Sequence, residues 1–267
     1  MLEKMKKMKW RPRNIIGAVV GISFIASIIF VIIRLFIAPG TPNENMPFQK
    51  VRSDYALMLA QCVLGLLMIY FPYLLQKKWK ILLPDMMYIL FFIFLYCAIY
   101  LGEVRSFYYT VPHWDTILHA ISAAMLATLG FNIVSLLNDS EVVRMNMSPF
   151  FVSFFAFCFA VAAGAVWEIY EFTFDGILGF NMQKFATYDG TLLIGRAALV
   201  DTMKDIIADT LSALLISILG YGQLRVINFH GKKVKLKALQ SQAEYAAASA
   251  KNINSSNNQE TDNTSTK

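Results

Sequence analysis

Residues 149–178 read PFFVSFFAFCFAVAAGAVWEIYEFTFDGIL. Positions 149–166 hold no charged side chain, whereas Glu168, Glu171 and Asp175 follow close together. About 20 predominantly apolar residues make a helix long enough to cross the roughly 30 Å hydrocarbon core of a bilayer. Lipid offers the backbone no hydrogen-bond partner, so a spanning segment of this kind must be helical. The stretch therefore predicts a transmembrane helix that carries three acids at one end.

The composition of the whole chain is that of a membrane protein. Of its 267 residues, 57% are hydrophobic and 16% are charged, compared with about 45–50% and about 25% in a soluble globular domain. Five more apolar stretches complete a set of six predicted spans: residues 15–36, 55–75, 81–101, 113–137, 149–178 and 198–221. They leave no room for a large soluble domain and exclude a water-soluble enzyme. We therefore predict an all-α fold, a polytopic bundle of six transmembrane helices over residues 15–222.

The cysteines and the common catalytic motifs add little. Cys62, Cys97 and Cys158 all lie in apolar runs, and an odd number without regular spacing predicts neither a disulfide framework nor a zinc motif. The sequence has no P-loop, no dinucleotide-binding fingerprint and no Ser-His-Asp arrangement. The sequence therefore leaves open whether the protein is an enzyme.

Lysine and arginine residues are distributed unevenly among the segments between the spans. The N-terminal segment, residues 76–80, residues 138–148 and the start of the C-terminal segment carry fifteen of them, whereas the other segments carry five. Cytoplasmic segments are the ones enriched in Lys and Arg, so we expect both termini on the cytoplasmic side of the cell membrane. This topology accounts for most of the net charge of +6. The expected partner is therefore the lipid bilayer, and no nucleic-acid partner is predicted.

The two ends of the chain are expected to lie outside the membrane domain. Residues 1–14 are basic, and the apolar run after them is longer than the h-region of a secretory signal, about 7–15 residues, so we expect an uncleaved anchor. Residues 223–267 begin with lysines that we expect at anionic headgroups. From Ala246 onward this segment is rich in Asn, Ser, Thr and Gln. Such a composition buries too little apolar surface to fold, so we expect a disordered tail.

Many of the acids lie in or next to predicted membrane spans, where charged side chains are rare. Seven of the eighteen acids and two of the three histidines lie in, or at the ends of, the last three predicted spans. They are Asp115, Glu168, Glu171, Asp175, Asp201, Asp205 and Asp209, with His113 and His119. At 1.5 Å per residue, the deepest of them lie roughly 9 to 15 Å below the outer ends of their helices. The set is therefore expected in the outer half of the membrane and at its rim.

The spacing of these residues places them on one face of each helix, because positions three, four and seven or eight apart lie on the same side. The three sets are Asp115, His119 and Ser122; Glu168, Glu171 and Asp175; and Asp201, Asp205, Asp209 and Ser212. His113 falls on the other side of its helix. A charged residue near the bilayer centre costs about 2.5–3.5 kcal/mol. The three faces are therefore expected to point at one another or at a water-filled cleft.

Like charges gathered in this way repel, so either several acids are protonated or a cation holds them together. Arg34, Arg105 and Lys204 are the candidate fixed positive charges at this depth. The loop at residues 179–197 lies directly above the cluster, and it is equally compatible with a lid, a re-entrant segment or a plain exposed loop. Gly164, one turn before Glu168, is expected to allow close packing of two helices.

A metal site is the hypothesis that we favour. Carboxylate and imidazole ligands without thiolate suit Mn, Fe, Zn or Mg. The predicted ligands are His119, Glu168, Glu171 and Asp205, with Asp115 and Asp175 in the wider set. Asp201 and Asp209 are the predicted catalytic residues, either as a general base or by orienting a ligand. Such a site would act at the outer face of the membrane on a lipid or lipid-linked envelope substrate.

Two other classes of function fit the same residues. A small-cation or proton-coupled transporter would use the acids as binding sites, but the inner halves of these spans, 150–161 and 214–219, are almost purely apolar. A non-enzymatic envelope or assembly factor would use the cluster only to hold its helices together. In that case Asn or Ser would serve as well as an acid, without the cost of burying charge.

Three linked motifs also carry a resemblance to a known family. They read His113-Trp114-Asp115-x-x-x-His119, Trp167-Glu168-x-x-Glu171-x-x-x-Asp175 and Asp201-Thr202-x-x-Asp205-x-x-x-Asp209. In this order, within residues 103–221, they resemble the bacterial inner-membrane family typified by YjdF, which is loosely similar to VanZ-like proteins. The resemblance implies a multi-pass membrane protein and assigns no catalytic residue. The link to VanZ-like proteins implies a role at the cell envelope, such as resistance to cell-wall-directed agents.

Overall fold

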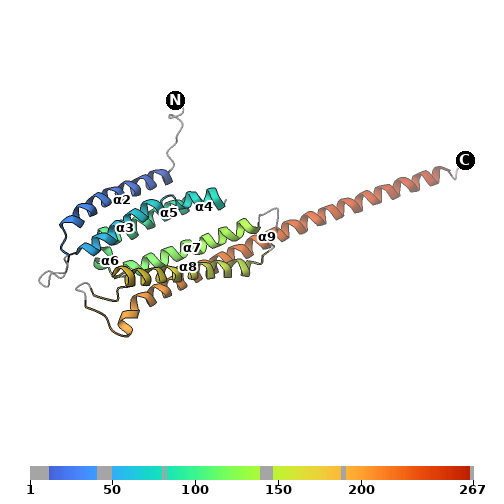
Figure 1. The fold of residues 1–267 in the computed structure, drawn as a ribbon. Coiled ribbons are helices and arrows are strands. Elements are labelled where there is room, and N and C mark those ends of the chain that lie inside the picture. Colours follow the sequence, from blue (N-terminus) through green and yellow to red (C-terminus); the bar gives the residue numbers. More distant parts are fainter. Residues whose placement is uncertain are drawn as a thin grey trace, which may run out of the picture. The chain divides into compact units, whose positions relative to one another are not determined.

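The structure, a computed structural model, describes residues 12–40, 50–79, 81, 83–138, 147–187 and 191–264. In these ranges the chain is built of helices, and β-structure is limited to an isolated bridge between Ala186 and Leu192. In chain order the helices (Figure 1) are α2 (Pro12–Ile37), α3 (Arg52–Met68), α4 (Phe71–Trp79), α5 (Asp85–Leu95), the π-helix η1 (Tyr96–Val104), α6 (Phe107–Thr110), α7 (Trp114–Asn138), α8 (Pro149–Leu178) and α9 (Arg196–Thr264).

Six helical segments are long and apolar enough to cross a membrane. They are Pro12–Ile37, Arg52–Trp79, Asp85–Val104, Trp114–Leu137, Pro149–Leu178 and Arg196–Phe229. Each coincides with one of the six apolar stretches in the sequence. The predicted all-α fold class with six membrane-spanning helices is therefore confirmed.

Prolines explain two differences between the expected and the observed spans. The second span is interrupted between Met68 and Phe71, next to Pro72, since proline supplies no backbone N–H. The third helix begins at Asp85 rather than at residue 81, because Pro84 has extended backbone (ψ 149°) and stands at the N-cap. A proline is well tolerated there, since the first turn has no intrahelical acceptor for its N–H.

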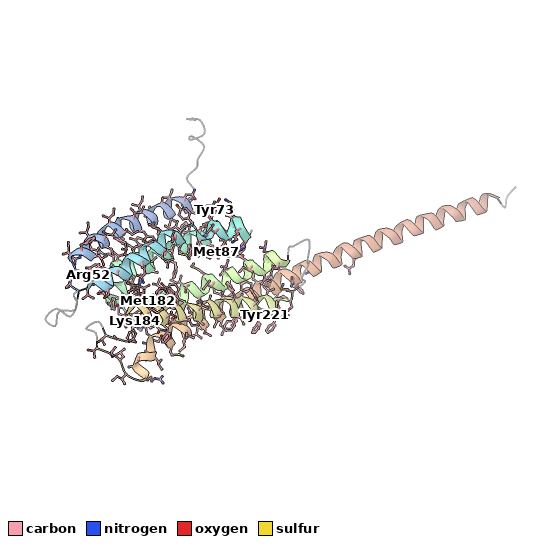
Figure 2. All side chains as sticks on the ribbon, in the orientation of Figure 1. Arg52, Tyr73, Met87, Met182, Lys184 and Tyr221 are labelled. Carbon is pink, nitrogen blue, oxygen red and sulfur yellow. The ribbon has the colours of Figure 1, made fainter. Side chains whose placement is uncertain are left out.

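Many of the exposed side chains on these helices are large and apolar, and Figure 2 shows side chains standing out from the ribbon along the helices. On α8, for example, Ile169, Phe172 and Ile177 are 63%, 70% and 72% exposed, while Glu168 and Glu171 are buried. A helix that is apolar outside and polar inside is the pattern expected when lipid replaces water as the solvent. The acids of this helix therefore face the protein.

The chain divides into two units, Met1–Ile218 and Leu219–Lys267. In the first unit, α2 packs on α3 and α5, and α7 packs on α8. Phe24 of α2 is fully buried in the core of the N-terminal half. In the C-terminal half, α7, α8 and α9 meet at three alanines, Ala127, Ala160 and Ala213, each 0% exposed. Small residues of this kind let membrane helices approach closely.

The second unit contains the later part of α9, which is helical to Thr264. This differs from the disorder expected from Ala246 onward. The stretch at 243–250 contains five alanines in eight residues, and alanine has the highest intrinsic helix propensity. Local propensity therefore favours the helix in a segment whose polar composition alone indicates disorder.

Candidate metal site

The candidate site lies where α7, α8 and α9 present their polar faces to one another. His119 of α7 is at its centre and is only 6% exposed. Its Nδ1 is 3.3 Å from Oδ2 of Asp209, and its Nε2 is 3.7 Å from Oε1 of Glu168 and 3.9 Å from Oδ1 of Asp115. One imidazole therefore contacts acids from all three helices. The expectation that the three acidic faces point at one another is confirmed.

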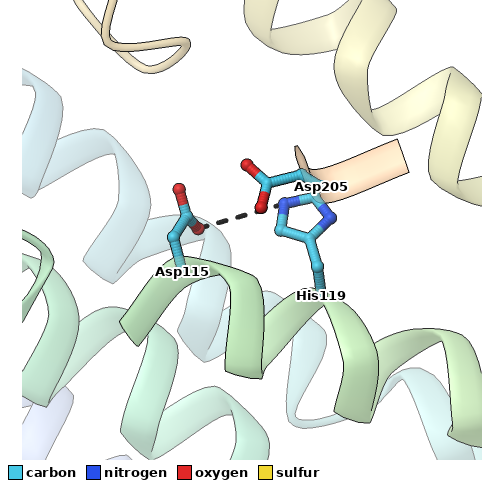
Figure 3. Close-up of side chains that lie close together, drawn as sticks. All are labelled: Asp115, His119 and Asp205. Carbon is cyan, nitrogen blue, oxygen red and sulfur yellow. Dashed lines mark ion pairs between the residues drawn. The ribbon is translucent and has the colours of Figure 1, made fainter. Parts of the chain in front are cut away.

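Three side chains of the cluster are close enough to bind one ion together. Asp115, His119 and Asp205 each offer a ligand atom, and the three atoms lie within 4.8 Å of one another. In Figure 3, Asp115 and His119 project from successive turns of α7 toward Asp205. The spacing i, i+4 on α7 brings the first two together, and the approach of α9 supplies the third.

Several buried carboxylate oxygens at this place have no hydrogen-bond partner among the described residues. They are Oε1 of Glu168, Oδ1 of Asp205 and Oδ1 of Asp209. Their side chains are buried, with residue exposures of 5%, 2% and 2%. Leaving a buried polar atom unpaired costs roughly 1–3 kcal/mol, and more when the group is charged. A bound cation, or bound protons, would remove this cost.

The other predicted acids have partners within the protein. Oε1 of Glu171 accepts a hydrogen bond of 2.9 Å from Trp167 Nε1. The two oxygens of Asp175 accept the backbone N–H groups of Met182 and Gln183, at 2.8 and 2.9 Å. The predicted acids therefore fall into two groups. Asp115, Glu168, Asp205 and Asp209 lie around His119, whereas Glu171 and Asp175 bind other parts of the chain.

The loop after α8 is folded over the cluster. Gly179 ends the helix in the left-handed region (φ 68°), which glycine adopts without strain. The side-chain amide of Asn181 then donates to the backbone carbonyl of Ala186 and accepts a hydrogen bond from the backbone N–H of the same residue. The side-chain amide of Gln183 donates to Oε2 of Glu168 (3.3 Å) and to Thr202 (2.9 Å). The loop is therefore held against α8 and α9 by specific hydrogen bonds, as a lid or a re-entrant segment would be.

Lys184 of this loop is the positive charge beside the cluster. Its Nζ pairs with Asp115 Oδ2, and it lies 3.1 Å from both carboxylate oxygens of Asp201. Burial alone would lower the pKa of Lys184, but the nearby carboxylates of Asp115 and Asp201 outweigh burial and raise it. Lys184 is therefore a fixed cation that joins α7 to α9.

The three cations proposed from the sequence do not have this role. Arg34 donates to the hydroxyl of Tyr55 at 3.0 Å, and Arg105 and Lys204 are exposed. In the part of the chain that the structure describes, none of the three forms an ion pair with an acid of the cluster. His113 is exposed, as its place on the other side of the helix indicates. The one signal for Lys184 in the sequence is its place in the short loop between two acid-bearing spans.

A second polar group, which the sequence did not indicate, lies partly buried in the N-terminal half. Glu103, on the π-helix η1, accepts a hydrogen bond of 3.0 Å from the amide of Gln61, and its backbone carbonyl accepts one from Lys50. Burial lowers the pKa of Lys50 and raises that of Tyr108 well above its usual value. Tyr108 also lies under Lys184, whose Nζ is 5.8 Å from the ring centroid. The sequence signal that could have indicated this contact is the presence of Gln61 and Glu103 on two successive spans.

Apolar packing lies on the other side of the cluster, deeper in the three-helix interface. The buried residues Ala127, Ala160 and Ala213 are joined there by the partly buried Phe157 and Val161. Close packing of this kind leaves few voids large enough for water. The polar face is therefore followed along these helices by an apolar contact.

The fold and the site together define a polytopic membrane protein with a buried histidine–carboxylate cluster. The chain belongs to the family described as "Predicted membrane protein (DUF2238)", which matches residues 19–226. The matched range contains every acid of the cluster and His119. No curated protein and no solved structure matches the chain.

Proposed function

We propose that this protein binds a divalent metal ion at the His119 cluster and acts with it on a lipid or lipid-linked substrate of the cell envelope. The observation that carries the proposal is a set of three buried carboxylate oxygens, on Glu168, Asp205 and Asp209, that have no partner in the described chain. Glu168 and Asp209 contact the His119 imidazole, and Asp205 belongs to the same three-atom group as His119. A divalent cation would satisfy them together, whereas a purely structural network would have paired them.

The donor set fits a metal that binds oxygen and nitrogen. Asp115, His119 and Asp205 supply the three atoms that lie closest together, and Glu168 and Asp209 contact the same imidazole. Carboxylates with one imidazole suit Mn, Fe, Zn or Mg. In this proposal Asp209, at 3.3 Å from Nδ1, orients the ring and leaves Nε2 for the metal.

The remaining predicted residues support the site rather than bind the ion. Glu171 and Asp175, which we expected among the ligands, hold Trp167 and the loop. Asp201, which we expected as a catalytic group, is paired with Lys184. Glu168, in contrast, stays a proposed ligand through its Oε1, which is buried and has no partner in the described structure. When bound, the metal would lower the pKa of a coordinated water and so supply a nucleophile.

A lipid-linked substrate is supported by what surrounds the acids. Trp167 and Phe172 of α8 are 45% and 70% exposed, while the neighbouring Glu168 and Glu171 are buried. Acyl chains would lie against these exposed aromatic side chains and keep a polar headgroup close to the cluster. The resemblance to VanZ-like proteins also favours a role at the cell envelope, and the distribution of Lys and Arg favours the outer face.

Transport is less well supported. A transporter needs a polar route through the membrane, and in the described structure Ala127, Ala160 and Ala213 pack the three helices together beyond the cluster. A cluster that is followed by an apolar contact fits a reaction or a binding event at the cluster better than passage of an ion.

The experiment that tests the proposal is metal analysis of protein purified in detergent without chelator. Elemental mass spectrometry is expected to find close to one divalent metal ion per chain. A Glu168→Ala, Asp205→Ala double variant should lose it while remaining folded, and Asp85→Ala, at an exposed ion pair with Arg13, should retain it. No metal in the wild type, even after reloading, would overturn the proposal.

A further inference from the structure

We infer that Lys184 is an internal counter-cation that opposes the metal, so that the segment Asn181–Lys184 closes over the site when the ion is absent and is released when it binds. The inference rests on the proposed function and adds a regulatory element to it. It is carried by the contacts of one short, fully described segment with all three acid-bearing helices.

The ammonium group of Lys184 joins two of those helices. It pairs with Asp115 of α7 and with both carboxylate oxygens of Asp201 of α9. The backbone of Lys184 is in the left-handed region (φ 48°), which costs free energy for a residue with a side chain. The two ion pairs therefore hold the residue in a conformation that it would not adopt alone.

The residues just before Lys184 attach the segment to the third helix. The N–H groups of Met182 and Gln183 donate to the carboxylate of Asp175 on α8. The amide of Gln183 reaches Glu168 on α8 and Thr202 on α9. The segment is thus fixed by the same polar faces that form the candidate site, and any change in their charge acts on it directly.

Asp115 belongs to both arrangements. One of its oxygens, Oδ1, lies 3.9 Å from His119 Nε2, and the other, Oδ2, pairs with Lys184. The same carboxylate supplies one atom of the three-atom group that suits an ion. A divalent ion beside His119 would place two cations on one carboxylate, where they repel each other at short range. It would also withdraw negative charge from Asp115 and weaken the hold of that carboxylate on Lys184.

Metal binding therefore disfavours closure of the segment, and closure disfavours metal binding. The two effects are equal in free energy, because the coupling between two binding events is reciprocal. In the ion-free protein, Lys184 compensates Asp115 and Asp201 and covers the cluster. In the loaded protein, the released ammonium is available beside the ion for an anionic group of a substrate.

The test uses Co²⁺ as the titrant on the full chain in detergent, with its visible absorption as the signal. Lys184→Gln is expected to bind Co²⁺ about tenfold more tightly than the wild type, because the competing charge is gone. Lys184→Arg keeps the charge and should retain wild-type affinity. Lys204→Gln removes an exposed lysine of α9 that lies three residues after Asp201. This change should have no effect on Co²⁺ affinity.

A second measurement follows the segment itself. Trypsin cleavage after Lys184 is expected to accelerate at least severalfold when Co²⁺ is bound, whereas cleavage after the exposed Lys233 should not change. Equal or weaker Co²⁺ binding by Lys184→Gln, or protection of Lys184 by the ion, would overturn the inference and leave the metal site standing. Absence of Co²⁺ binding by both wild type and Lys184→Gln would overturn the proposed function as well.

Discussion

Gly164 on α8 leaves the space that the carboxylate of Asp209 on α9 fills. A Cβ atom at position 164 would collide with that carboxylate. Because the glycine has no side chain, Asp209 can approach α8 and still place its Oδ2 3.3 Å from His119 Nδ1. The expectation that Gly164 allows close packing is confirmed, and what it admits is an acid of the cluster.

Gly164→Ala is therefore expected to displace Asp209 from His119. Overpacking of a close contact costs about 1–3 kcal/mol, and the loss should appear as a lower melting temperature in detergent together with reduced metal content. Gly176→Ala on the same helix is the matched control, since no described atom lies within 4 Å of a Cβ at that position. Equal behaviour of the two variants would show that the contact between α8 and Asp209 is not needed.

Asp175→Ala is expected to release the loop. It removes the acceptor of two backbone N–H groups, those of Met182 and Gln183, and hydrogen bonds to a charged group contribute about 1.5–3 kcal/mol each. Faster trypsin cleavage after Lys184 would report the release. Thr173→Ala, whose hydroxyl donates to the Ile169 carbonyl of its own helix, should leave cleavage unchanged. If Asp175→Ala is cleaved at the wild-type rate, the carboxylate does not anchor the loop.

Ser212→Ala tests whether a hydrogen bond between two helices can be removed without loss of the metal. The Ser212 hydroxyl donates to the Ala120 carbonyl across the α7–α9 contact at 2.6 Å. Hydrogen bonds between membrane helices contribute about 0.6 kcal/mol on average, so we expect a small loss of stability and full metal content. Thr210→Ala, whose hydroxyl bonds within α9, should cost less. Loss of the metal in Ser212→Ala would favour a single structural network.

The ion pairs of Lys184 predict a specific dependence of stability on pH. The pKa of Lys184 is raised above its ordinary value of 10.5, against the effect of burial, by Asp115 and Asp201. Its contribution to stability is therefore fully present below about pH 10 and declines as pH rises through the folded-state pKa. Thermal unfolding of wild type and Lys184→Met from pH 7 to 11 should show a constant difference that falls only at the alkaline end.

Lys50 provides a control of opposite sign. Burial lowers its pKa below 10.5, so the folded state releases its proton before the unfolded state does. The wild type should then gain stability relative to Lys50→Met as pH rises toward 10.5. Two difference profiles that bend in the same direction would contradict the assignment of a paired Lys184 and a desolvated Lys50.

The sequence predicted those features that depend on periodicity and length. Each span is long enough to be recognised alone, and the i, i+3 and i+4 spacings of the acids determine which side of a helix they share. Once one side of each helix must avoid lipid, residues as distant as Asp115 and Asp209 have to meet. The same reasoning placed His113 outside the cluster.

Features that depend on the path of a loop could not be predicted in this way. Lys184 reaches Asp115 and Asp201 because Gly179 turns the chain back and Asn181 and Asp175 hold it there, and none of these contacts has a periodic signature. The hydrogen bond between Glu103 and Gln61 joins helices whose relative placement the sequence does not reveal. Tertiary structure decides both.

X-ray absorption at the edge of the retained metal shows which atoms bind it, and so whether His119 and its carboxylates are the ligands. We expect one imidazole and several oxygen ligands, with metal–ligand distances of about 2.0–2.2 Å for zinc, and an imidazole contribution that disappears in His119→Asn. Sulfur ligation, or an unchanged spectrum in His119→Asn, would place the ion elsewhere and overturn the proposed site.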